Sequence, residues 1–276
     1  MVSAAASLMP VIMRIRGSKR ANRSRESALA GILENRAYAG APRLRGVDVR
    51  RDDDVITIAP PSATGVELLW FHGGSYVSDF APQHFAFLRR LALATGATIH
   101  AQVYELAPHQ TAERTVARAA ALLERHPDAL VGGDSAGGGL AVAASLAVGS
   151  RRSLLLLSPW LDIRLTDPAI ASLEPRDPWL SVTGLRVAGE LYRGELSDDD
   201  PRVSPLLADL SGLGPSLIVC GDRDILLADS RAFAAKAPNS ELHVARGMLH
   251  VFPLLPIPEA RPAVELFASR LRTAAR

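Results

Sequence analysis

Residues 132–138 read GGDSAGG, and this stretch decides the fold of the chain. Apolar residues 129–131 precede it and a run of small and apolar residues, 140–148, follows it, so the pattern predicts a strand, a sharp turn and a helix with Ser135 at the apex. Glycines two positions before and after the serine leave room where strand and helix approach too closely for side chains. Such a turn strains the serine backbone and presents its hydroxyl above a sheet, which predicts a nucleophile. An ordinary glycine-rich turn is the alternative, whereas the glycine spacing excludes a dinucleotide-binding fingerprint.

A serine nucleophile needs a general base, and in hydrolases with this turn the acid and then the histidine follow the serine along the chain. Of the seven histidines, only His243 and His250 follow Ser135. His243 lies in the alternating run 240–245, which predicts a strand that fixes its side chain. His250 comes after that strand on a loop, where a base can serve both the nucleophile and the leaving group. We therefore predict that His250 is the general base.

Three aspartates compete for the role of the acid. The apolar run 217–220 predicts a buried parallel strand, and Asp222, Asp224 and Asp229 follow it. Asp229 falls in the first turns of the next helix, and Asp222 suits a solvated turn or a helix N-cap. Asp224 stands at the apex of the loop and is the predicted acid, which would orient the imidazole and stabilise the imidazolium.

The fourth part of the predicted site lies upstream of the serine. Residues 66–71 predict a strand that ends in His72, Gly73 and Gly74. Glycines let backbone N–H groups turn inward without a Cβ in the way, so the N–H groups of Gly73, Gly74 and Ala136 are the predicted oxyanion donors. His72 has no second ligand nearby in this stretch, so we expect it to hold the loop by a hydrogen bond. No metal and no cofactor are predicted.

Together these motifs resemble those of the bacterial carboxylesterases in the hormone-sensitive-lipase-like branch of the α/β-hydrolases. The matching segments are 71–77, 104–108, 133–138, 158–162, 200–206, 224–229 and 247–252, which are collinear. The resemblance implies hydrolysis of carboxylic esters, with short to medium acyl chains expected, through an acyl-enzyme. It assigns Ser135, Asp224 and His250 as the triad, and it assigns Gly73, Gly74 and Ala136 to the oxyanion hole.

This chain departs from the family pattern at three places outside the triad. Ser75 stands where the family usually has a third glycine, Glu105 where it has an arginine, and Gly139 where an asparagine is common. These departures leave the reaction type in place and make the substrate harder to predict. An amidase, a lactonase or a deacylase would use the same triad. A ligand-binding receptor on the same fold is a further alternative, although receptors of this kind lose the histidine that is present here as His250.

Strand and helix signals alternate along the chain, which predicts the α/β-hydrolase fold with about eight strands in a mostly parallel, doubly wound sheet that has helices on both faces. The expected strands are 47–49, 55–58, 66–71, 98–104, 129–133, 153–158, 216–220 and 241–245, and the expected helices are 83–95, 111–125, 137–148, 226–237 and 259–275. All the predicted site residues then lie at the carboxyl ends of strands, where such sheets hold their active sites.

Two segments fall outside the predicted sheet. We expect a catalytic core over 47–162 and 200–276, and a small helical cap made of N-terminal helices in 1–46 and a second segment, 163–199. In the first segment Leu8, Val11, Ile12 and Ile15 form a stripe that predicts a helix packed by that face.

Composition favours one globular body. The 276 residues are 48% hydrophobic and carry a formal net charge of +2. Basic residues are concentrated before Asp52, which suits a solvated helical face better than a nucleic-acid or membrane-surface site. The single cysteine, Cys220, excludes an intramolecular disulfide and is expected to pack in a buried strand. No run approaches the roughly 20 apolar residues of a membrane span. We expect a cytoplasmic enzyme acting on a small ester, without a nucleic-acid partner, and leave a homodimer open.

Overall fold

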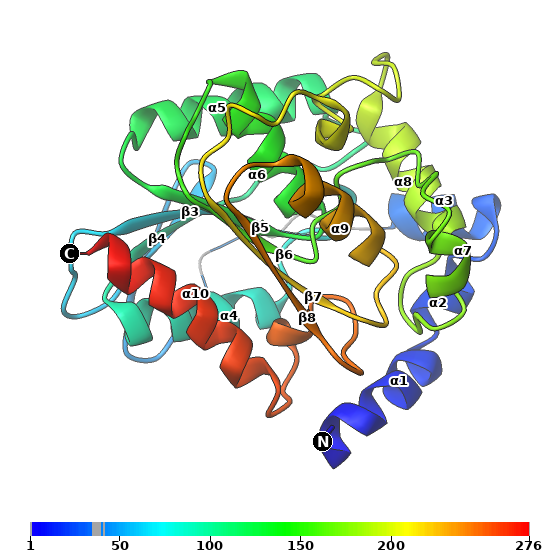
Figure 1. The fold of residues 1–276 in the computed structure, drawn as a ribbon, viewed down its shortest axis with the longest axis horizontal. Helices are drawn as coiled ribbons and strands as arrows, with labels where there is room; N and C mark the ends of the chain where they lie inside the picture. Colours follow the sequence, from blue (N-terminus) through cyan, green and yellow to red (C-terminus); the bar gives the residue numbers. More distant parts are fainter. Residues whose placement is uncertain (1, 35–39, 41, 276) are drawn as a thin grey trace.

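A computed structural model describes residues 2–34, 40 and 42–275 (Figure 1). Its centre is an eight-stranded sheet in the order β1-β2-β4-β3-β5-β6-β7-β8. The strands are β1 (Asp48–Asp52), β2 (Val55–Ala59), β3 (Glu67–Phe71), β4 (Thr98–Gln102), β5 (Leu130–Asp134), β6 (Leu154–Leu157), β7 (Ser216–Gly221) and β8 (Ser240–Ala245). Strand β2 is antiparallel to both of its neighbours, and β3 to β8 are parallel to one another. The predicted mostly parallel sheet is confirmed.

Helices cover both faces of the sheet because its central strands are apolar on both sides. In β6, Leu154 and Leu156 pack into the core beneath one helical layer, while Leu155 and Leu157 pack into the core beneath the other. The first layer holds α5 (Ala112–Arg125), α6 (Ala136–Ala147) and α9 (Leu227–Lys236), and the second holds α4 (Pro82–Thr95) and α10 (Ala260–Ala274) (Figure 1). The doubly wound arrangement is therefore confirmed as well.

The two segments that we predicted to form a cap are in contact with each other. They contain α1 (Ala4–Arg16), α2 (Ser18–Ala21) and α3 (Arg25–Leu33), and α7 (Ile170–Leu173) and α8 (Val182–Arg193). Helix α3 packs against α8, and the Ser181 hydroxyl donates to the Asn22 carbonyl at 2.8 Å. Within the predicted segment 1–46, residues 1, 35–39 and 41 lie outside the described residues. A capping role for these helices stays a prediction.

The predicted packing face of α1 is wrong. Leu8 and Ile15 are 58% and 80% exposed, Val11 is also exposed and Ile12 is only half-buried, whereas Ala6 and Met13 on another side of the helix are buried. Helix α1 is apolar on most of its surface, so hydrophobic spacing alone could not select the side that meets the body. Among the described residues, no helix combines the length and the apolar character needed to cross a bilayer.

Candidate active site

The turn at Ser135 has the strained geometry that its glycine-rich surroundings predict. Strand β5 ends at Asp134 and α6 begins at Ala136. Ser135 between them has φ 52° and ψ −121°, a backbone conformation that residues other than glycine rarely adopt. A Cβ added at Gly133 would lie 2.3 Å from the Gly137 carbonyl oxygen, and one added at Gly137 would lie 2.0 Å from the Phe71 oxygen. Strand and helix therefore approach so closely that only glycine fits two positions before and two positions after the serine.

Three predicted residues, Ser135, His250 and Asp224, are joined by hydrogen bonds, and we call them the triad. The Ser135 Oγ to His250 Nε2 distance is 3.0 Å, and the His250 Nδ1 to Asp224 Oδ2 distance is 2.9 Å. Because the carboxylate accepts the proton on Nδ1, Nε2 is left to accept from the serine hydroxyl. The serine and histidine are each 4% exposed and the aspartate is fully buried. Such an arrangement can move a proton from the hydroxyl to the imidazole.

The charge on Asp224 sets the proton affinity of His250. Burial by itself lowers the pKa of His250, but the Asp224 carboxylate and its hydrogen bond, together with the charges of Asp177 and Asp134, outweigh that effect, so the pKa is raised above its ordinary value. The imidazolium is therefore stabilised at the place where a general base would hold a proton during the reaction.

Ser158 holds the loop that carries the histidine. Val251 directly follows His250, has φ 43°, and donates its N–H to Ser158 Oγ at 3.2 Å. Ser158 follows β6 and itself has a positive φ of 46°. Sequence reasoning placed Ser158 in a family segment but did not find this contact, because it joins two loops that are far apart in the chain.

Asp177, from the segment between α7 and α8, braces the loop of the acid. Its Oδ2 accepts the Ile225 N–H at 3.2 Å, and its Oδ1 accepts the N–H groups of Trp179 and Leu180 at 2.8 and 2.9 Å. Burial, followed by the charge of Asp224, raises the pKa of Asp177 to about 6. Sequence reasoning missed this residue. The local signal that could have found it is the turn pattern, in which an aspartate accepts the backbone N–H groups of the second and third residues after it.

Asp134 ties the nucleophile turn to the loop after β3. Its Oδ1 accepts from the Trp70 indole at 3.1 Å, and its Oδ2 accepts from the Gly73 N–H at 3.0 Å and lies 3.1 Å from His84 Nε2. The single N–H of Gly73, a predicted oxyanion donor, is thus engaged by a carboxylate. By contrast, the N–H groups of Gly74 and Ala136 have no acceptor within the part of the chain that the structure describes.

His72 is buried and shapes the same loop. Its Nδ1 lies 2.6 Å from the Gly73 carbonyl oxygen, its ring stacks on Tyr104 with centroids 4.2 Å apart, and the Tyr104 hydroxyl donates to the His72 carbonyl at 2.7 Å. Burial lowers the pKa of His72 to about 4, so the imidazole is neutral at neutral pH. These contacts agree with the expectation that His72 holds the loop by a hydrogen bond.

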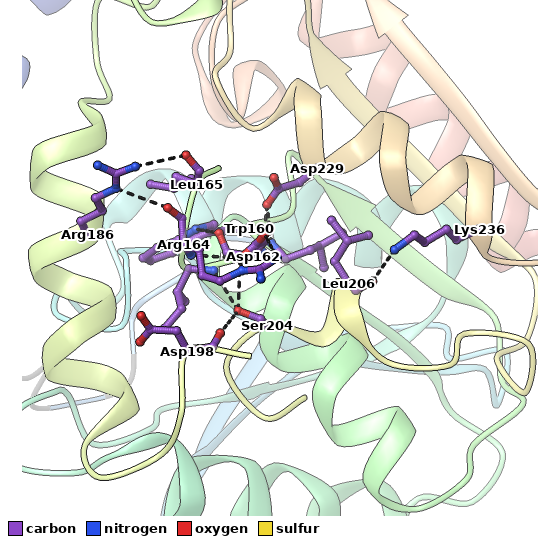
Figure 2. Close-up of polar contacts among 12 residues, drawn as sticks. Trp160, Asp162, Arg164, Leu165, Arg186, Asp198, Ser204, Leu206, Asp229 and Lys236 are labelled. Atoms are coloured by element: carbon purple, nitrogen blue, oxygen red, sulfur yellow. Dashed lines mark hydrogen bonds and ion pairs between the residues drawn. The ribbon is translucent and has the colours of Figure 1, made fainter. Parts of the chain in front are cut away.

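The other two candidate aspartates face elsewhere. Asp229 accepts the N–H groups of Leu161 and Asp162 at 2.7 and 3.1 Å and so anchors the chain that leaves β6, as Figure 2 shows. Burial raises the pKa of Asp229 to about 8. Asp222 accepts the Gly247 N–H at 2.7 Å, so it is neither an N-cap nor a purely solvated turn residue. His243 lies in edge strand β8, as predicted, and is paired with Glu241.

Known proteins are similar to this chain over most of its length. A family model described as the alpha/beta hydrolase fold matches residues 68–254. The chain is 33% identical to an acetyl-hydrolase of Streptomyces hygroscopicus over 80% of this chain and 83% of that one. It is also 33% identical to an esterase of Acinetobacter venetianus, a match that spans 66% of this chain and just under two thirds, 65%, of the relative.

Solved structures give the same placement over the whole length. A hormone-sensitive-lipase homologue from a metagenome library superimposes with a TM-score of 0.83 at 28% identity, covering 100% of both chains. An esterase of the bacterial hormone-sensitive lipase family gives a TM-score of 0.81 at 28% identity and the same coverage. The chain therefore belongs to the α/β-hydrolase family, as an esterase-type enzyme of the group that resembles hormone-sensitive lipase.

Proposed function

We propose that this enzyme hydrolyses small carboxylic esters through an acyl-enzyme on Ser135, with His250 as general base and acid and Asp224 as the orienting carboxylate. The observation that carries the proposal is the pair of contacts within the triad, 3.0 Å from Ser135 Oγ to His250 Nε2 and 2.9 Å from His250 Nδ1 to Asp224 Oδ2. Serine, imidazole and carboxylate in this order are the parts that nucleophilic acyl transfer requires.

The reaction proceeds in two steps. His250 takes the hydroxyl proton as Ser135 Oγ attacks the ester carbonyl, and the tetrahedral intermediate then collapses as His250 passes the proton to the leaving alcohol. Water repeats the cycle on the acyl-enzyme and releases the acid. Asp224 stays ionised throughout and stabilises the imidazolium. The raised pKa of His250 supports this role, because burial by itself would lower that pKa.

Backbone amides stabilise the oxyanion. Of the three predicted donors, Gly74 and Ala136 are assigned to this role. Gly73 is assigned instead to fixing the loop, since its N–H donates to Asp134 at 3.0 Å. A donor in such a site contributes about 3 kcal/mol to transition-state stabilisation. Replacing Asp134 by asparagine is expected to disturb the loop and lower kcat more than it raises KM.

Short acyl chains are the proposed substrates. Two relatives are named for acetyl substrates, an acetyl-hydrolase of Streptomyces hygroscopicus and an ethyl acetate hydrolase of Pseudomonas putida that is 28% identical. The expected result is a kcat/KM that is highest for acetyl to butyryl esters of p-nitrophenol and falls for octanoyl and longer esters.

The test of the nucleophile is Ser135→Ala, which should lower kcat on p-nitrophenyl butyrate by about 10⁶-fold. A variant that hydrolyses this ester at the parent rate would end the assignment.

A fluorophosphonate probe should label the parent and spare the variant, and a folded parent that resists labelling would favour a receptor. Matched esters, amides and lactones measured side by side then separate an esterase from an amidase or a lactonase.

A further inference from the structure

Three chemically active side chains meet far from the triad, and we call them the imidazole cluster. Glu67 Oε1 lies 2.9 Å from His100 Nε2, and Glu67 Oε2 lies 3.1 Å from His126 Nδ1. The two imidazole rings are 4.2 Å apart between centroids. One ligand atom from each of the three residues lies within 4.8 Å of the others. The proposed reaction uses none of these groups.

The register of the sheet brings the cluster together. His100 in β4 pairs with Leu69 of β3 and with Thr57 of β2, so these three positions share one face of the sheet. Glu67 stands two residues before Leu69 and therefore points to the same face. His126 is the C-cap residue of α5, the helix that covers this face. Ligands from two strands and a helix thus converge at the amino end of β3, while the triad lies at the carboxyl ends of its strands.

The donor set suits a first-row transition metal. Two imidazole nitrogens and one carboxylate are ligands that Zn²⁺ prefers, whereas Ca²⁺ and Mg²⁺ require mostly oxygen. Zinc bonds of about 2.0–2.2 Å place tetrahedral ligand atoms about 3.4 Å apart, so the present separations need only small side-chain rotations. His100 Nδ1 lies 3.2 Å from Thr57 Oγ1, which can hold the proton-bearing nitrogen and leave Nε2 free to bind the metal.

The cluster also has room for a fourth ligand. A cavity of about 470 Å³ lies beside it, and both His100 and His126 line this cavity. The side chains of Glu67 and His126 are 36% and 22% exposed, so an ion can enter from solvent. Three protein ligands with one open position form the usual arrangement of a zinc site that keeps a water molecule.

We propose that Glu67, His100 and His126 bind one divalent transition-metal ion of the zinc class, with solvent from the cavity as the fourth ligand. The ion would fasten β3 and β4 to the end of α5 and so stabilise the sheet at the amino end of β3. The alternative is that the three side chains only hydrogen-bond to one another and bind no metal ion.

The test uses the full chain without a histidine tag, stripped of metal and titrated with Zn²⁺ by calorimetry and with Co²⁺ by visible absorption. The parent should bind one equivalent and give the absorption bands of a tetrahedral Co²⁺ site. Glu67→Gln and His126→Ala should each weaken binding by about 100-fold or more. His243→Ala is the matched control, because it removes an exposed histidine that is paired with Glu241, and it should bind as the parent does.

A second measurement follows stability. Zinc at about 100 times its Kd should raise the Tm of the parent and of the control by about 5 °C and leave the two cluster variants unchanged. Circular dichroism checks that the variants fold. The proposal is overturned if the parent binds no metal, if the cluster variants bind as tightly as the parent, or if His243→Ala alone abolishes binding.

Discussion

The triad and the imidazole cluster place the same chemical groups at opposite ends of one sheet. Each contains a carboxylate that is 2.9 Å from an imidazole nitrogen, Asp224 with His250 in the triad and Glu67 with His100 in the cluster. The side chains of the triad pair are 0% and 5% exposed, whereas those of the cluster pair are 36% and 11% exposed. Equal distances thus occur in very different surroundings.

What separates the two regions is the third partner and the access of water. In the triad the third group is a serine hydroxyl held on a strained turn, and burial strengthens every charge interaction around it. In the cluster the third group is a second imidazole next to a cavity, which favours binding an ion over moving a proton. The same histidine–carboxylate distance can therefore serve different functions, depending on how deeply the pair is buried and which group lies next to it.

The largest effect is expected when the two histidines that follow the serine are replaced in turn. His250→Ala should lower kcat by about 10⁶-fold, because it removes the proton acceptor of Ser135. His243→Ala should leave turnover within about twofold, since a surface substitution of this kind has little to disturb. Initial rates on p-nitrophenyl butyrate measure both, and equal losses in the two variants would show that position in the triad is not what matters.

Removing the charge from the triad carboxylate is the next largest change. Asp224→Asn should lower kcat by about 10⁴-fold. Burial lowers the pKa of His250, and the charge of Asp224 is the largest of the effects that raise it, so a neutral side chain at position 224 should let the pKa fall. Activity needs the unprotonated imidazole, and the acid limb of kcat/KM should therefore move to lower pH. A pH profile in which that limb stays in place or moves up would contradict the assigned role.

The support of the histidine loop should matter less. Ser158→Ala removes the acceptor of the Val251 N–H, a 3.2 Å contact that positions the residue after His250. We expect kcat to fall by about tenfold, equivalent to roughly 1.4 kcal/mol, with KM almost unchanged. Ser158→Thr retains the hydroxyl and should recover part of the loss. An unchanged kcat, or a rise in KM alone, would remove Ser158 from the support of the site.

A buried carboxylate with no histidine partner isolates the effect of burial. Burial raises the pKa of Asp229 to about 8, above the value of an unfolded chain. The folded protein then holds more protons than the unfolded one from about pH 4 to pH 8, so this group makes the free energy of unfolding fall as pH rises through that window. Asp229→Asn should remove up to about 1.4 kcal/mol per pH unit of that slope. Urea unfolding at pH 5, 6 and 7 measures it, and parallel slopes would refute the prediction.

Local patterns were sufficient to predict most of the fold. Apolar runs located the central strands, because a strand buried on both faces must be apolar throughout, and alternation located the outer strands, all within a few residues. Ser135 was found from its flanking glycines, and Asp224 and His250 from chain order. The roles of these three residues stay predictions, although the structure brings them into contact.

What sequence could not predict depends on contacts between distant segments. Nothing near Gly73 indicates that its N–H meets Asp134, and nothing near Glu67 indicates that His100 and His126 approach it from a neighbouring strand and a helix end. The prediction of the packing face of α1 was wrong for a different reason. A helix that is apolar nearly all round has no unique side that must be buried.

The contact between Lys19 and the segment before α8 matters for protein engineering. The Lys19 ammonium donates to the Asp177 carbonyl oxygen at 2.7 Å, and the Asp177 carboxylate accepts the N–H of Ile225, the neighbour of Asp224. We therefore expect fusions, truncations or random libraries aimed at the amino terminus to change, through this short chain of contacts, the position of Asp224 in the proposed site as well as solubility and expression.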